Sequence, residues 1–450
     1  MRLFIPFLLS AMLSITLLSC SQNISPGREV ISPLSETEMA IPDGRYQANF
    51  DMYHSAQVDF PPPSEKPSVI WVKTTMEDPR RWLTVVGDSE GGCVFSWNPN
   101  KKFEDNVTRL APGGNVAWTY MNLHPANAQR SVTAPGLVTE GAILLHQFAV
   151  NTAANEQWLV IDCIDLEGNL RWRSEKVPGQ YTNDDLFRLP GNKVALISYP
   201  DTLYVFNLEN GELEKELSFD GYPTLYSSPP LPTPDGGFVH VGGKHGLDDE
   251  DITIVKYSQD FEEIWHATIE NVFSVLNSSI SSDGNLLVSV NFRKQSAGEP
   301  RITRLFSYDI SDGSVKWSRE VGLTIILGNT KDGNFLVHSA SDQHTESLLL
   351  LNPGGDEIWS LDLSNRSWNL YSLPVIYTDS SILYGHDEGI TLINPDGTIK
   401  WELTKNELGF EHDSDLDHWT LYPYADDSFI AAVLDRENET EYIMKLGLDD

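Results

Sequence analysis

Short apolar runs separated by glycine-containing turns recur along most of the chain, and long helical periodicity is nearly absent. One kind of turn precedes a strand that carries tryptophan, as in Asn394-Pro-Asp-Gly-Thr-Ile-Lys-Trp401. Glycine supplies the positive φ that a tight hairpin needs, and Asn, Asp or Pro initiates the turn. The pattern repeats at intervals of 42 to 54 residues, with equivalent positions at Trp118, Trp172, Lys215, Trp265, Trp317, Trp359 and Trp401.

A second kind of turn opens an apolar strand between these motifs, as in Asp283-Gly-Asn-Leu286. We place the starts of these strands at residues 83, 143, 194, 238, 286, 335, 382 and 429. Two interleaved hairpins give four strands in each unit of about 45–50 residues, which is typical of a propeller blade. The sequence therefore predicts an all-β fold, an eight-bladed β-propeller of four-stranded antiparallel blades.

The eighth unit, from Leu421 to Asp450, contains only three expected strands, the last from Glu441 to Leu446. Its fourth strand must come from elsewhere in the chain, and the segment from Arg45 to Phe60 is free to supply it. Closing a ring in this way removes the exposed sheet edges that invite aggregation. We therefore expect an N-terminal strand to close the ring.

The glycine turn followed by tryptophan resembles the quinoprotein-type repeat, also called the PQQ-like repeat, over residues 46–450. It departs from the repeat at Lys215 and at the glycine missing before Trp265. The resemblance implies that the tryptophans are structural and pack between neighbouring blades. The matching residues are Trp118, Trp172, Trp265, Trp317, Trp359 and Trp401, with turn glycines Gly113, Gly168, Gly211, Gly313, Gly355 and Gly397.

The N-terminus has the pattern of a targeting segment over residues 1–19. Arg2 precedes an apolar run from Leu3 to Leu18 that is too short and too interrupted for a comfortable membrane span. The sequence Leu17-Leu18-Ser19-Cys20 resembles the bacterial lipobox, which implies acylation of Cys20; a plain cleavable signal is the alternative. Residues 20–45 are polar and predict a flexible tether. Ser21 in place of an Asp favours an outer-membrane anchor.

A lipobox followed by eight such units resembles the propeller lipoproteins of the outer-membrane barrel-assembly machinery. The chain is strongly acidic, with 31 Lys and Arg against 65 Asp and Glu, and its formal charge is −34. This balance argues against nucleic acid as a partner and against docking on anionic lipid through basic side chains. It favours solubility and says little about the fold.

The sequence carries few of the residues that would hold a cofactor. Quinone-dependent dehydrogenases that share the repeat carry adjacent cysteines and a calcium site, whereas Cys93 and Cys163 are 70 residues apart. We therefore expect no quinone and no other cofactor. In an exported protein these two cysteines either form a disulfide or remain as buried thiols, and the sequence leaves both open.

Four histidines, His146, His240, His338 and His386, fall two to four residues into the second strand of four units. Blades form a wide ring, so these four cannot converge on one ion. A smaller set drawn from neighbouring units could meet, namely His338, His344 and His386 with Asp342 or Asp387. We expect ordinary strand and loop histidines and no metal site. A six-bladed sulfotransferase family uses a catalytic histidine on a related-looking repeat, but its blade count disagrees with eight.

The acidic runs at 248–251 and 413–417 lack the spaced ligands of an EF-hand loop, so we expect solvated loops there, with calcium binding left open. The long connections after the second strands share one face of a propeller, and loops on a rigid scaffold are where binding usually resides. These connections are Gly243 to Asp251, Arg293 to Arg301, Ser341 to Glu346 and Asp435 to Glu441.

The first functional hypothesis is a non-catalytic, monomeric, lipid-anchored scaffold of the cell envelope that binds a protein partner through this face. Arg293, Lys294 and Arg301 are the candidate partner-binding residues, because local basic groups offset the acidic field; the alternative is that they only neutralise nearby acidic loops. The second hypothesis is a binder or sensor of a small molecule or polysaccharide in the central funnel. The third is an enzyme acting on an envelope substrate.

Overall fold

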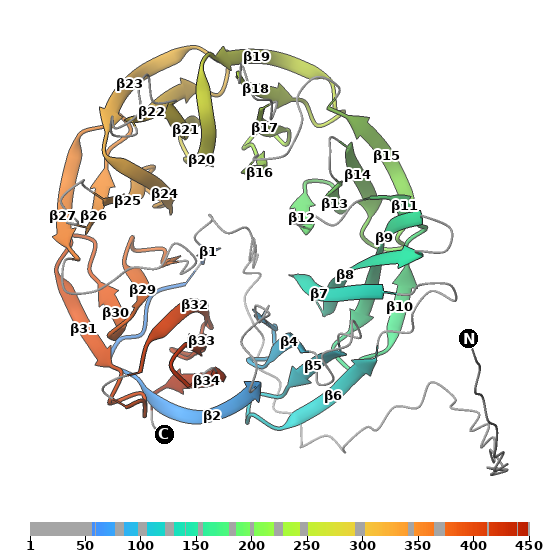
Figure 1. Cartoon of the computed structure of the whole chain (residues 1–450), viewed down its shortest axis with the longest axis vertical. Coiled ribbons are helices and arrows are strands. Elements are labelled where there is room, and N and C mark those ends of the chain that lie inside the picture. The colour runs from blue at the N-terminus through green and yellow to red at the C-terminus, as the bar shows by residue number, and fades with distance from the viewer. Residues whose placement is uncertain are drawn as a thin grey trace, which may run out of the picture.

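The computed structural model of the chain is a ring of eight antiparallel sheets (Figure 1). Every regular element among the described residues is a strand, and none of those residues forms an apolar helix long enough to cross a bilayer. The predicted eight-bladed, all-β propeller is therefore confirmed. The structure describes residues 56–58, 60–76, 85–97, 106–121, 130–139, 141–151, 156–179, 186–198, 202–219, 228–243, 251–292, 302–340, 346–363, 374–411, 414–438 and 440–448.

The blades are numbered in chain order, and the strands of each run from the centre of the ring outward. Blade one contains β3 (Val85–Gly87), β4 (Cys93–Trp97), β5 (Asn106–Leu110) and β6 (Val116–Met121). Blade two contains β7 (Arg130–Thr139), β8 (Ala142–Asn151), β9 (Glu156–Asp165) and β10 (Leu170–Arg173), with β11 (Val177–Pro178) also paired to β9. Blade three contains β12 (Leu186–Leu189), β13 (Lys193–Ser198), β14 (Thr202–Asn207) and β15 (Leu213–Ser218). Blade four contains β16 (Ser228–Pro232), β17 (Phe238–Gly243), β18 (Ile252–Tyr257) and β19 (Glu263–Ile269).

The second half of the ring follows the same order. Blade five contains β20 (Val272–Ile280), β21 (Asn285–Phe292), β22 (Ile302–Asp309) and β23 (Val315–Val321). Blade six contains β24 (Leu323–Asn329), β25 (Phe335–Ala340), β26 (Glu346–Leu351) and β27 (Glu357–Asp362). Blade seven contains β28 (Val375–Ile376), β29 (Ile382–His386), β30 (Gly389–Ile393) and β31 (Ile399–Thr404), with β1 (Ala56–Gln57) inside β28. Blade eight contains β32 (Leu416–Pro423), β33 (Phe429–Asp435), β34 (Thr440–Gly447) and β2 (Ser68–Met76).

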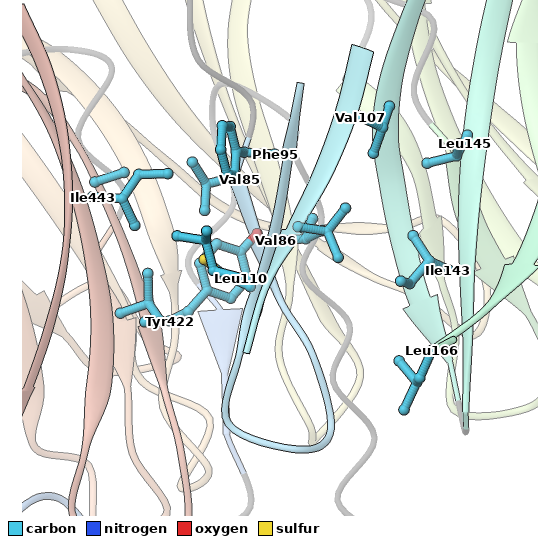
Figure 2. Packing of buried hydrophobic residues seen from close by; sticks show 14 of the residues in the cluster. Val85, Val86, Phe95, Val107, Leu110, Ile143, Leu145, Leu166, Tyr422 and Ile443 are labelled. Atoms are coloured by element: carbon cyan, nitrogen blue, oxygen red, sulfur yellow. The ribbon is translucent and has the colours of Figure 1, made fainter. Parts of the chain in front are cut away.

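The hydrophobic core lies between the blades. Both faces of the second strand of a blade are covered by neighbouring sheets, so these strands are largely continuous apolar runs rather than alternating ones, as in β29 and β33. Burial of one such aliphatic side chain contributes about 1.5–3 kcal/mol. Figure 2 shows one of these interfaces, where blade one lies between blades eight and two, with Val85, Val86, Phe95, Val107, Leu110, Ile143, Leu145, Leu166, Tyr422 and Ile443 in one cluster.

An N-terminal strand closes the ring, as expected, but it is not the expected one. β2 pairs antiparallel with β34, from Ser68 opposite Gly447 to Met76 opposite Glu441. The expectation that the segment from Arg45 to Phe60 supplies this strand is wrong. Its described residues include β1, which pairs in parallel with β28 at the inner edge of blade seven. The outer strand of a blade carries a tryptophan, and β2 has one whereas the segment 45–60 has none.

Trp71 of β2 occupies the eighth repeat position and is the seventh repeat tryptophan. The turn pattern missed it because no turn precedes it in the chain. Its indole N–H donates to the Pro112 carbonyl of blade one at 2.8 Å. The ring packs on Gly114, where an added Cβ would lie 2.7 Å from the indole. Gly114, with φ of 77°, is therefore the glycine of this turn that the contact requires, in place of the expected Gly113.

The same tryptophan–glycine contact joins five further pairs of blades. Each indole N–H donates to a turn carbonyl of the next blade at 2.7–3.1 Å. A Cβ on the turn glycine would lie 2.4–2.9 Å from the ring, and the glycine has positive φ. The pairs are Trp118–Gly168, Trp172–Gly211, Trp265–Gly313, Trp317–Gly355 and Trp359–Gly397.

Trp401 of blade seven is buried, but its indole nitrogen has no hydrogen-bond partner among the described residues. In blade eight the third and fourth strands come from opposite ends of the chain, so no hairpin turn connects them. Trp401 instead shares a cluster with Val58, and Phe60 packs against that cluster. Lys400, next to Trp401 in β31, donates from Nζ to the Pro63 carbonyl at 3.1 Å, so the chain leading into β2 lies beside this strand.

The two departures from the repeat, Lys215 in place of tryptophan and the glycine missing before Trp265, belong to the same contact between blades three and four. Lys215 replaces tryptophan in the outer strand of blade three, and the turn it would face, in blade four, has Phe261 where the others have glycine. Without an indole above it, this position can carry a side chain. Phe261 takes a left-handed φ of 64° and packs with Phe238, while Lys193 lies 5.3 Å from its ring centroid.

The first unit also differs from expectation. Its second strand is β4, beginning at Cys93, and not a strand from residue 83. Asp88 defines the turn before it by accepting the backbone N–H of Gly92 at 2.9 Å. Residues 98–105, between β4 and β5, lie outside the described ranges.

Deleting residues 68–76 should leave the outer edge of β34 unpaired and remove the Trp71 contact with blade one. We expect loss of monomer and aggregation, measured by size-exclusion chromatography, because an exposed strand edge is a template for pairing. Deleting residues 46–54 is the matched control and should leave the melting temperature unchanged. A monomeric, cooperatively melting protein lacking 68–76 would contradict this closure.

Restoring the lost contact gives a second prediction. Lys215→Trp alone should destabilise the protein, since the indole would collide with Phe261. Combined with Phe261→Gly, the same change should stabilise it, with a coupling free energy of about 1–3 kcal/mol in a double-mutant cycle. Additive effects in denaturant unfolding would show that the two departures are independent.

Candidate functional site

The strand order divides the connections between two faces of the ring. One, the short-turn face, carries the connections between strands one and two and between strands three and four of each blade. These turns bond to each other, as where Ile310 N–H donates to Gly284 O at 3.0 Å and Leu208 N–H to Asn192 O at 3.0 Å. The other, the loop face, carries the connections between strands two and three and those from blade to blade. The short-turn face is thus the more tightly fixed of the two.

Among the described residues, three large apolar side chains are exposed at the loop face. They are Phe273, Ile302 and Leu323, with 47%, 44% and 41% of their surface accessible, and we call them the blade five–six patch. All three stand at the loop-face ends of adjoining strands: Ile302 is opposite Phe292 in the ladder, and Leu323 begins β24. Exposed apolar groups on one face are typical of a docking surface.

The other exposed large apolar residues have a different location. They lie near the short-turn ends of the outer strands, spread around the rim of the ring, so they form no comparable group in one place. They are Ile70, Val72, Val116, Leu170, Ile264, Val315, Ile358 and Ile399.

Charged and aromatic groups border the patch. Arg304 lies over the ring of Phe292, at 5.3 Å from its centroid, and forms an ion pair with Glu320. β21 ends at Phe292 and β22 begins at Ile302, so the connection 293–301 starts and finishes beside the patch. Arg293, Lys294 and Arg301 belong to this connection and lie outside the described residues.

Sequence reasoning selected the connection but missed the apolar patch beside it. Phe273, Ile302 and Leu323 each stand at or next to the first residue of a strand, directly after a blade-to-blade or second-to-third-strand connection. The sequence signal that could have identified these residues is an apolar side chain at the first or second position of a strand that follows a loop-face connection.

The histidines lie in second strands, as expected: His146 in β8, His240 in β17, His338 in β25 and His386 in β29. Burial lowers the pKa of His146 to about 4, so it is neutral at pH 7. His240 stacks on Phe219 with centroids 4.1 Å apart. These contacts place the rings in the packing of the sheets.

The alternative to ordinary histidines was a metal site formed by His338, His344 and His386. His338 Nε2 lies 3.5 Å from Glu346, and His386 Nε2 lies 2.8 Å from the Thr391 hydroxyl. The described residues contain no group of three or more potential His, Cys, Asp or Glu ligands. His344 and Asp342 lie outside the described ranges.

The structure decides between a disulfide and two buried thiols for Cys93 and Cys163. Cys93 and Cys163 are buried free thiols in blades one and two. Burial raises the pKa of both thiols, that of Cys163 to about 11, so neither is a thiolate at neutral pH. Cys20 and the rest of residues 1–55 lie outside the described ranges.

In the acidic run 413–417, the carboxylate of Asp417 is paired with Arg436. In the run 248–251, Asp251 accepts the backbone N–H of Asn271 at 3.2 Å, and residues 248–250 are not among those described. Asp435, at the start of another long connection, binds the Asn438 side chain at 2.8 Å. The carboxylates of Asp417, Asp251 and Asp435 are thus engaged with the protein itself.

Comparisons with known proteins locate the fold but not the activity. The sequence matches no protein-family model, and a search of curated proteins finds no relative. Among solved structures, the Dos1 propeller aligns over 85% of this chain and 95% of its own, with 10% identity and a TM-score of 0.52. At such identity the similarity concerns the fold alone.

Two further solved structures align with TM-scores just below 0.5. One is BamB from Moraxella catarrhalis, with 13% identity, a TM-score of 0.49, and coverage of 85% of this chain and 100% of its own. The other is a europium-containing methanol dehydrogenase, with 8% identity, a TM-score of 0.49, and coverage of 85% and 93%.

Proposed function

We propose that the chain is a non-catalytic, lipid-anchored scaffold of the bacterial cell envelope that docks a protein partner on the loop face of blades five and six. The observation that carries this proposal is the blade five–six patch. Its three apolar side chains are between 41% and 47% exposed and adjoin a connection with three basic residues. Apolar anchors bordered by charge are typical of the energetic centre of an interface.

The direction of β1 also supports the loop face as the docking face. β28 runs toward the short turn in which Tyr377 N–H donates to Ser381 O at 2.9 Å. β1 is parallel to β28, so β1 begins at the loop-face end of the ring's centre. A flexible tether of residues 20–45 would span roughly 28 Å on average. An anchor on Cys20 would therefore favour a loop face directed toward the membrane and any partner held there.

The remaining parts of the proposal follow from the sequence. Residues 1–19 are the signal, 20–45 the tether and 46–450 the propeller, and the anchor is in the outer membrane. The protein is monomeric, and no cofactor is required for a role carried by docking alone.

The anchor is tested by Cys20→Ala. A multiply acylated cysteine holds a protein firmly on a bilayer, so the wild type should remain with membranes after a carbonate wash and the variant should be soluble. Ser21→Ala, which keeps the cysteine, is the control and should behave as wild type. Membrane retention of Cys20→Ala would rule out anchoring through this residue.

The docking face is tested by a photocrosslinking amino acid at Ile302, in envelopes of the native host. Val315, in the same blade and 54% exposed, is the matched control at the rim. We expect a protein adduct from position 302 and none from 315. Reversing the charge of Arg293, Lys294 and Arg301 together should lower the adduct yield about tenfold or more without changing the melting temperature. Equal adducts at both positions, or an unchanged yield after charge reversal, would refute docking at this patch.

A further inference from the structure

A cavity of about 270 Å³ lies between blades two and three, on the side of the short-turn face. Blade two contributes β9 and β10 to its wall, and blade three contributes β12 and two short turns. Its lining includes Cys163, Arg171, Trp172, Arg188, Asn192 and Glu209. The cavity is therefore remote from the loop face, and the docking proposal does not use it.

The two arginines of this cavity, Arg171 exposed and Arg188 half-buried, differ from the other arginines whose side chains are described. Seven arginine side chains are described, and five donate to a carboxylate or a carbonyl, namely Arg109, Arg173, Arg304, Arg319 and Arg436. Arg171 and Arg188 form no ion pair or hydrogen bond within the described part of the chain. The chain has 65 acidic residues against 31 basic ones, so partners for arginine are abundant. Two unpaired guanidinium groups on one cavity are not explained by a shortage of carboxylates.

From these two arginines we infer that the cavity is a binding site for a small oxyanion, a phosphate or carboxylate group on a short organic body. A guanidinium presents its N–H donors in a planar fork that matches two oxygens of such a group. The arginines come from two different blades, so one anion between them would also bridge the blades.

The other lining residues set the charge and size of the ligand. Because its pKa is raised to about 11, the Cys163 thiol adds no negative charge at pH 7. Glu209 adds one, so the lining has two positive charges and one negative charge and suits a ligand with a single charge or slightly more. The volume of about 270 Å³ is just below the range for drug-sized ligands.

Trp172 supplies the apolar wall. Its indole N–H is already used, since it donates to Leu208 O at 3.1 Å. The ring therefore offers the ligand an aromatic surface and no hydrogen bond, which suits the carbon part of an organic anion. Selectivity for the charged end is left to Arg171 and Arg188.

The test is isothermal titration of the full-length protein with inorganic phosphate and, separately, succinate, at constant ionic strength set with chloride. We expect saturable binding of at least one of them, weakened about tenfold or more by Arg171→Ala or Arg188→Ala. Arg188→Lys should bind more weakly than wild type, because it keeps the charge but loses the fork. Lys331→Ala, which removes a positive charge from a short turn of blade six, is the control and should bind as wild type.

Preference for phosphate or for succinate assigns the head group. Each variant is first shown to melt as wild type in chloride alone, and Arg188→Lys preserves the test should an alanine variant not fold. No saturable binding of either anion by the wild type would overturn the inference. So would equal binding by wild type and Arg171→Ala/Arg188→Ala, which would reveal only a general ionic effect.

Discussion

The indole of one blade, seated on the glycine turn of the next, is the contact on which the ring depends. It combines a large buried aromatic surface with a hydrogen bond to the turn carbonyl, and truncating a well-buried tryptophan in a core costs about 3–5 kcal/mol. The contact requires a turn residue with positive φ and no Cβ, which is why Gly114 and its equivalents cannot be exchanged freely. It also explains why Lys215 and Phe261 depart from the repeat together.

Because the turn chemistry is local, the blade count and strand order could be predicted from sequence. Trp71 could not, since its partner turn at Pro112 belongs to another blade and its own strand completes a sheet begun at the far end of the chain. The patch residue Ile302 was also missed, because its exposure depends on which strands end beside it. The pairing state of Arg171 and Arg188 depends likewise on packing between blades, which no spacing in the sequence encodes.

The two faces of the ring differ in how tightly their connections are fixed. All six tryptophan–glycine contacts use turns between third and fourth strands, so they lie on one side. That side holds the arginine cavity, whose walls are positioned by the same contacts, as Trp172 both packs on Gly211 and lines the cavity. The opposite side is free to vary in length and composition, and there the apolar patch adjoins a basic connection.

Closure through β2 and β34 also dictates an order of assembly. Ser68 and Gly447 are 379 residues apart, so blade eight has the highest contact order in the ring. While the chain is synthesised, blades one to seven can form in sequence, but β2 remains an unpaired apolar strand until β34 arrives. Pairing of β34 with β2 is therefore the event that ends the aggregation-prone phase of folding. A chain whose synthesis stops before β34 would leave β2 without a partner strand.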